Sequence, residues 1–206
     1  MQRTGIWRDY CCVCRDLFIR QFQRMYIASQ KRKENIAEYL LYMWQIEDVI
    51  RAYGLDIERI DDAVIGKMNL DDEHRRELRE WYVSLIDMMR REDVVASGHL
   101  QINRNTLGQL VDLHRRLLSN AKFAEYSAQL YKTLPFIVEL RAKAGANPVG
   151  ELETCFNALY GVLLLRLGGK EVTKDTADAV AQISRLIGML AAYFKLEQED
   201  KLDWGD

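Results

Sequence analysis

Apolar side chains recur every three or four residues along most of this 206-residue chain, and only two prolines interrupt it. That spacing gathers the apolar residues on one face of an α-helix, because each helical residue turns by about 100°. No segment alternates apolar and polar residues as a half-buried strand does, and the strand–helix–strand rhythm of α/β proteins is missing. We therefore predict an all-α fold, an antiparallel multi-helix bundle of about seven helices.

Glycine-containing breaks and N-terminal capping residues set the expected helix boundaries. Pro135 should kink or split the fifth helix, because proline removes a backbone hydrogen bond. The apolar run 155–167 is expected to be a central buried helix, and no stretch reaches the ~18 apolar residues of a membrane span. The expected helices cover about 31–53, 55–67, 69–96, 100–120, 122–143, 150–167 and 174–198.

Residues 1–24 differ from the rest of the chain. They carry a net charge of +3 in a chain of net charge −2, and they hold Cys11, Cys12 and Cys14, three of the four cysteines. A basic arm and a metal-binding cysteine cluster are both open interpretations, although zinc sites usually need a second ligand pair that this chain lacks. We favour a third interpretation, in which this basic, Cys-rich head lies outside the domain and translation starts at Met25.

The expected domain organisation is a single helical domain over residues 25–206, ending in a loose acidic tail from Glu197 onward. Arg15 and Asp16 interrupt the only apolar run near the N-terminus, so that run does not resemble a signal peptide. A chain with free thiols and no export signal is typical of the cytoplasm. We therefore predict a cytoplasmic protein.

Charge argues against two classes of partner. The net charge of −2 gives no overall attraction to nucleic acid or to an anionic membrane. Basic pairs such as Arg75-Arg76 and Arg115-Arg116 alternate with acidic residues, which is typical of a solvated helix face. The 31–53 helix is apolar over more than half its circumference, which suits a central helix or one packed against a second copy. We therefore expect a homo-oligomer, with no membrane or nucleic-acid partner.

Two stretches resemble a known family. They are MYIASQKRKENIAEYLLYMWQIEDVIRAYGLDIERI, beginning at Met25, and GHLQINRNTLGQLVDLHRRLL, beginning at Gly98. Both are similar to a bacterial family described only as domain of unknown function 4924, and the resemblance covers about residues 25–198. It implies a helical bacterial protein. It implies no activity and no catalytic residues.

Two polar residues interrupt otherwise apolar helix faces. Glu47 falls between Leu40, Met43 and Ile50, whereas its neighbour Asp48 is expected nearer solvent. His114 falls on the apolar face of the 100–120 helix in the same way. If that helix begins early, His99 and Asn103 lie on the same stripe as His114.

The sharper hypothesis is that Glu47, His99 and His114 converge. Two histidines and one carboxylate can bind a divalent metal, and Glu47 with His114 can form an acid–base pair. The alternative is a satisfied core, in which His114 hydrogen-bonds Glu47, a tyrosine or a backbone carbonyl group. Since helical metal proteins usually repeat an ExxH motif that this chain lacks, we favour the satisfied core and expect no cofactor.

Three classes of function remain open from the sequence. We favour a structural or protein-interaction bundle. The first alternative is a metal-dependent or acid–base enzyme that uses Glu47 and His114. The second is a nucleic-acid-associated regulator that uses the basic pairs.

Overall fold

The computed structural model describes residues 32–144 and 149–205, and this part of the chain contains helices and no strands. The all-α prediction is confirmed. Each of the seven predicted helices corresponds to an observed one. In chain order they are α4 (Ile36–Ala52), α5 (Ile57–Ala63) followed by the 3-10 turn η1 (Ile65–Lys67), α6 (Asp72–Arg91), α7 (Gln101–Leu118), the 3-10 turn η2 (Ala121–Phe123) leading into α8 (Ala124–Ala144), α9 (Glu151–Leu167) and α10 (Lys174–Gln198).

Side-chain caps explain where four of these helices begin. Asn35, Asp56, Asp71 and Thr173 precede α4, α5, α6 and α10, and each side-chain oxygen accepts a backbone N–H of the following first turn. Such a cap satisfies a donor that the helix itself leaves unpaired. Because Asn35 leaves the helical conformation to cap α4, the helix predicted from residue 31 is interrupted there.

The end of α6 differs from the prediction, since the helix stops at Arg91 and not near residue 96. Two residues later Asp93 adopts a left-handed backbone conformation with φ of 55°, which terminates a helix. The Arg51 guanidinium then donates to the carbonyl oxygens of Val94 and Gly98, at 3.0 and 2.5 Å. These contacts hold residues 94–98 as a loop against α4.

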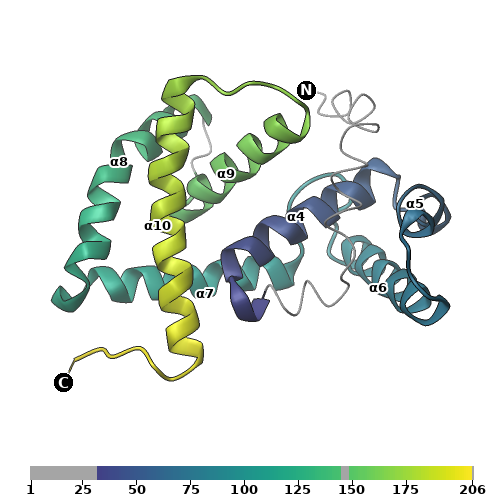
Figure 1. The fold of residues 1–206 in the computed structure, drawn as a ribbon, viewed down its shortest axis with the longest axis horizontal. Coiled ribbons are helices and arrows are strands. Elements are labelled where there is room, and N and C mark those ends of the chain that lie inside the picture. The colour runs from purple at the N-terminus through teal and green to yellow at the C-terminus, as the bar shows by residue number, and fades with distance from the viewer. Residues whose placement is uncertain (1–31, 145–148, 206) are drawn as a thin grey trace.

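Helix α4 is the central element. In Figure 1 it lies between α5 and α6 on one side and the group formed by α7, α8, α9 and α10 on the other. It contacts α6, α7 and α10, and ten of its residues are buried, including Glu47. The apolar face predicted for this helix is therefore largely covered within one chain.

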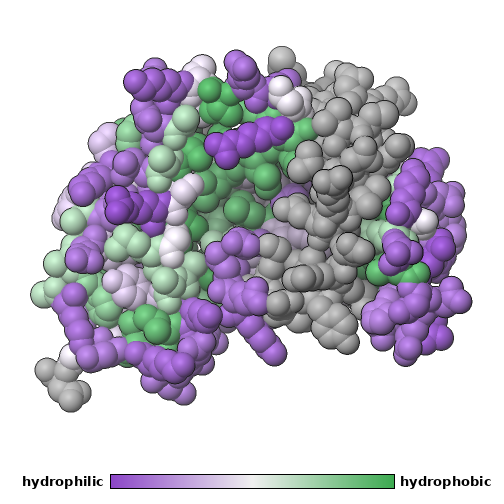
Figure 2. Space-filling view, in the orientation of Figure 1, coloured by the Kyte–Doolittle hydropathy of each residue, from purple (hydrophilic) through white to green (hydrophobic). Residues whose placement is uncertain are grey.

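Helix α9 is less buried than predicted. Cys155, Phe156 and Val162 are buried, but Leu159 and Leu163 are only half-buried, so a fully buried helix over 155–167 is wrong for its second half. This half lines an apolar groove with α8 and α10, and Figure 2 shows strongly hydrophobic side chains gathered there. The groove is lined by Leu140, Ala158, Gly161, Val162, Leu165, Thr176, Ala179, Val180 and Ile183.

Pro135 does not split α8, which runs as one helix from Ala124 to Ala144. Its side chain lies on the exposed face of the helix. The lost hydrogen bond, between position 135 and the Tyr131 carbonyl, therefore lies on the side where water can replace it.

Helix α10 bears on the prediction that no segment spans a membrane, because by length and composition alone it is long and apolar enough to cross one. A core helix of a globular protein passes the same test. In this fold α10 contacts α4, α7, α8 and α9, and it buries Ile183, Leu186, Ile187, Leu190, Ala191 and Phe194.

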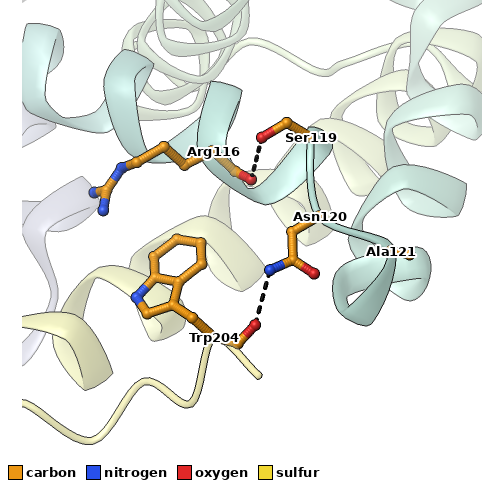
Figure 3. A pocket seen from close by; sticks show the side chains of 5 residues that line it. All are labelled: Arg116, Ser119, Asn120, Ala121 and Trp204. Carbon is orange, nitrogen blue, oxygen red and sulfur yellow. Dashed lines mark hydrogen bonds between the residues drawn. The ribbon is translucent and has the colours of Figure 1, made fainter. Parts of the chain in front are cut away.

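The tail that follows α10 is not loose over residues 199–205. The Trp204 ring stacks under the Arg116 guanidinium, 4.9 Å from its centroid, and lies edge-on to Phe123. Asn120 Nδ2 donates to the Trp204 carbonyl oxygen at 2.8 Å, so backbone and side chain are both anchored where α7 ends (Figure 3). A Lys122–Asp203 ion pair of 2.5 Å adds a third contact. The acidic composition of the tail gave no sign of this anchoring.

We expect Trp204→Ala to lower the free energy of unfolding by about 1–2 kcal/mol, through lost apolar burial and lost cation–π contact. Urea unfolding followed by circular dichroism measures the change. Lys201→Ala is the matched control in the same tail, because Lys201 is exposed and pairs only with Glu199. Equal unfolding midpoints for wild type and Trp204→Ala would show that the tail is loose after all.

Candidate functional site

The Glu47 side chain is fully buried, and three donors surround its carboxylate. Oε1 accepts the Leu100 backbone N–H at 2.9 Å and Asn103 Nδ2 at 2.7 Å. Oε2 lies 2.6 Å from His99 Nδ1. All three donors come from the first turn of α7 or the two residues just before it. We call Trp44, Glu47, His99 and Asn103 the Glu47 cluster.

The position of Glu47 explains how a carboxylate is tolerated in the core. Leu100 is the N-cap residue of α7, and its side chain makes no capping hydrogen bond. Glu47 supplies the missing cap from another helix, and its negative charge faces the positive end of the α7 dipole. Glu92 does the same for Gln101, whose N–H it accepts at 2.6 Å.

His99 links the Glu47 cluster to the surface. Its ring stacks on Trp44, with centroids 4.1 Å apart and planes 13° from parallel, and its side chain is 29% exposed. Among the residues that the structure describes, no partner is found for the buried Trp44 Nε1 or Asn103 Oδ1. The cluster therefore holds an unused donor and an unused acceptor close to an accessible histidine.

A second polar network adjoins the Glu47 cluster. Tyr160 of α9 donates to Asp48 Oδ2 at 2.7 Å, and Arg51 pairs with Asp48 Oδ1 at 2.9 Å. Burial, and then the Asp48 charge, raise the pKa of Tyr160 far above its usual value, so its hydroxyl stays protonated and donates. Asp48 is thus paired and half-buried, and it lies nearer solvent than the fully buried Glu47, as the sequence indicated.

His114 belongs to a different part of the core. Its Nδ1 lies 2.6 Å from the Tyr126 hydroxyl, and its Nε2 lies 3.7 Å from Glu151. Glu47 contacts Asn103, which is eleven residues before His114 on α7, or about 16 Å along the helix axis at 1.5 Å per residue. Glu47 and His99 meet as hypothesised, but His114 does not join them. The satisfied-core alternative named a tyrosine as one possible partner of His114, and the observed partner is Tyr126.

Because His114 lies away from Glu47 and His99, the hypothesised metal site lacks its third ligand. Within residues 32–144 and 149–205, no group of three or more His, Cys, Asp or Glu side chains is placed to hold a metal ion. Cys155 is buried, and burial raises the pKa of its thiol to about 12, which disfavours the thiolate that metals bind. The cysteines at 11, 12 and 14 lie outside the described residues.

Sequence reasoning missed the contributions of Trp44, Arg51 and Tyr160. A helical spacing was the available signal, since Trp44, Glu47, Asp48 and Arg51 follow the i, i+3, i+4, i+7 pattern of one face. Tyr160 gave no signal, because nothing local indicates that α9 lies beside α4.

Comparison with known proteins gives one match. The profile of the family described as "Domain of unknown function (DUF4924)" matches residues 25–201. The chain belongs to the DUF4924 family. The match spans both stretches that carried the resemblance and all of the Glu47 cluster. No curated protein and no solved structure matches this DUF4924 protein.

We expect Glu47→Ala to destabilise this DUF4924 protein by about 3 kcal/mol, because it leaves His99, the Leu100 N–H and Asn103 without their shared acceptor. Urea unfolding monitored by circular dichroism provides the measurement. Asp112→Ala is the control, since Asp112 is an exposed carboxylate paired only with Arg115. A loss below about 1 kcal/mol for Glu47→Ala would contradict the capping role.

The stability of the fold should fall on mild acidification because of His114. Desolvation by burial lowers its pKa in the folded state, so the unfolded state, with a pKa of about 6.5, binds the proton more readily. The His114 contribution is therefore present above about pH 6.5 and lost as the pH falls toward the folded-state pKa.

We expect His114→Gln to reduce the loss of unfolding free energy between pH ~7.5 and ~5.5, measured in urea. His74→Gln is the control of opposite sign, because the hydrogen bond to Asp71 raises the pKa of His74. The His74 contribution is present below about pH 6.5 and is lost as the pH rises through its folded pKa. An unchanged pH dependence in His114→Gln would rule out this role for His114.

Proposed function

We propose that this DUF4924 protein is a protein-interaction bundle that docks a second copy of itself through the outer face of α8. One observation carries the proposal. Helix α8 has an uninterrupted line of exposed apolar residues on the side away from its own core. We call this line the α8 stripe, and its members are Ala124, Ala128, Tyr131, Pro135, Val138 and Ala142.

The α8 stripe has the spacing of a helix-pairing surface. Successive members are separated alternately by four and three residues, as in the a and d positions of a coiled coil. Tyr131 and Val138 are 71% and 64% exposed, the highest values among the large hydrophobic residues of the described chain. The inner face of the same helix buries Tyr126, Leu130 and Ile137. Helix α8 is therefore apolar on two opposite sides, and the described part of the chain covers only one of them.

Charges along one edge of the α8 stripe favour a second copy as the occupant. Glu125, Lys132 and Glu139 repeat at seven-residue intervals beside the apolar line, with alternating sign. Lys132 has no ion-pair partner among the described residues. An antiparallel copy that places Lys132 opposite Glu139 of the other copy forms that pair twice, because the arrangement is two-fold. In the same register Tyr131 lies level with position 140 of the other copy, between Val138 and Ala142 of its stripe.

The other functional classes receive less support. Basic residues of the pairs considered for nucleic acid are already paired with acids, as in the Arg75–Asp61 and Arg116–Glu197 ion pairs. The enzyme built on Glu47 and His114 lacks a shared site, since the two side chains have different partners. We propose a soluble, cytoplasmic location, supported by the packing of α10 within the helical core.

Self-association is tested by sedimentation velocity over a range of concentrations. We expect the wild type to sediment as a dimer and the double variant Tyr131→Glu, Val138→Glu as a monomer with the same helical content. The control is Ile102→Glu, which changes a hydrophobic residue that is 39% exposed on α7, away from the stripe. A monomeric wild type, or a double variant that still dimerises, would overturn the proposal.

A charge swap tests the identity of the occupant and the antiparallel register. Lys132→Glu leaves three acidic residues along the edge of the stripe, so we expect it to weaken the dimer. Glu139→Lys in the same chain should restore the dimer, because the pair is re-formed with reversed sign. If the double swap associates no better than Lys132→Glu alone, the two residues do not face each other.

A further inference from the structure

The Nε2 edge of the His99 ring is the chemically free part of the Glu47 cluster. A carboxylate accepts hydrogen bonds and does not donate them, so the 2.6 Å contact to Glu47 places a proton on His99 Nδ1. The neutral ring then carries its lone pair on Nε2, for which the described residues supply no partner. Since Nδ1 faces a fully buried carboxylate, the 29% exposure of the side chain belongs to the opposite edge. His99 thus presents an oriented, accessible nucleophile.

Two buried N–H donors near His99 are unused. Trp44 is 1% exposed and stacks on the His99 ring, and its Nε1–H is without a partner in the described chain. Arg51 lies two turns after Trp44 on α4 and donates to the Gly98 carbonyl oxygen beside His99. Its buried Nε–H also has no partner among the described residues. Unpaired buried N–H groups are destabilising unless a ligand or water accepts from them.

The charged groups near His99 are largely paired with one another. The N-terminal end of α7 follows His99 directly, and Glu47 and Glu92 already accept its first backbone N–H groups. The neighbouring carboxylates are already occupied, because Asp48 accepts from Arg51 and Tyr160 while Glu92 accepts from Gln101. With these groups paired, the unused Trp44 Nε1–H beside the His99 ring is the donor that suits a group with anionic oxygens.

We propose that His99 is a phosphoryl-accepting residue, modified on Nε2 by a donor that carries a high-energy phosphoryl group, either an acyl phosphate or a phosphoramidate. In the reaction the Nε2 lone pair forms a new bond to phosphorus. The bond from phosphorus to the donor's leaving group breaks, and the leaving group departs with that electron pair. Nδ1 keeps its proton toward Glu47, whose negative charge balances the positive charge that develops on the ring. Glu47 is therefore a positioning residue, and His99 is the residue that reacts.

The two other histidines of the chain serve as internal controls. His74 is more exposed, at 45% of its side chain, and its Nδ1 is also held by a carboxylate, that of Asp71. Among the described residues no tryptophan stacks on the His74 ring, as Trp44 does on His99. His114 is buried against Tyr126. If exposure alone set the reactivity, His74 would react fastest of the three histidines. The proposal instead predicts that His99 reacts fastest.

The experiment uses potassium phosphoramidate as a small phosphoryl donor, from which ammonia leaves. The full-length protein is incubated with it, and mass spectrometry under non-acidic conditions measures phosphorylation at each histidine over time. We expect His99 to be labelled faster than His74 and His114, with phosphorus NMR identifying the Nε2 isomer. Faster labelling of His74, or phosphorylation of His99 on Nδ1, would overturn the proposal.

Two variants test whether the Glu47 cluster, and not the exposure of the side chain alone, makes His99 reactive. Trp44→Phe keeps a stacking ring and removes the unused N–H, and Glu47→Gln keeps the shape and removes the charge. We expect each variant to slow labelling of His99 at least about tenfold and to leave labelling of His74 unchanged. Circular dichroism confirms that the variant compared is folded, and Trp44→Phe alone is sufficient if Glu47→Gln unfolds. Labelling of His99 at the wild-type rate in a folded variant would show that the Glu47 cluster does not activate it.

Discussion

The buried carboxylate of Glu47 is the interaction on which the arrangement of this bundle depends. A charge in the core is tolerated only when several donors satisfy it, and here the donors all come from the start of α7. The position of Glu47 on α4 therefore dictates where α7 begins and how it meets α4. Arg51, one turn later on α4, fixes the preceding loop in the same way. Two charged residues of one helix thus set the path of the chain from residue 94 to 103.

Helix α7 is held at both of its ends by distant parts of the chain. Glu47 caps its start, and Trp204 of the C-terminal tail covers its end against Arg116 and Asn120. Between these points it contacts α4, α8, α9 and α10. This arrangement leaves the outer face of α8 exposed and places the His99 ring against Trp44. The proposed docking surface and the proposed reactive histidine both depend on it.

Most of the helical architecture could be predicted from the sequence. Helix periodicity and capping residues are local properties, so the starts at Asp71 and Thr173 and the inward faces of α4 and α10 follow from a few neighbouring residues. The errors occurred where distant contacts override local preference. Helix α6 ends early because Arg51 binds the loop beyond it. The acidic tail is held because Trp204 packs against the Arg116 guanidinium and the Phe123 ring. The half-exposed second part of α9 depends on which helices happen to lie beside it.

The sequence by itself determined that Glu47 and His114 are polar residues on apolar faces, because that property depends only on spacing along a helix. Only the tertiary structure decided their partners, since His99 and Asn103 lie 52 and 56 residues from Glu47 along the chain. It also decided that His114 lies with Tyr126, about three turns of α7 away from Asn103. The α8 stripe is local in spacing, but whether it faced the core or the solvent depended on the packing of α8 against α9 and α10. Hydrophobic periodicity specifies which faces of a helix are apolar, and the packing of the whole chain specifies which of those faces stays uncovered.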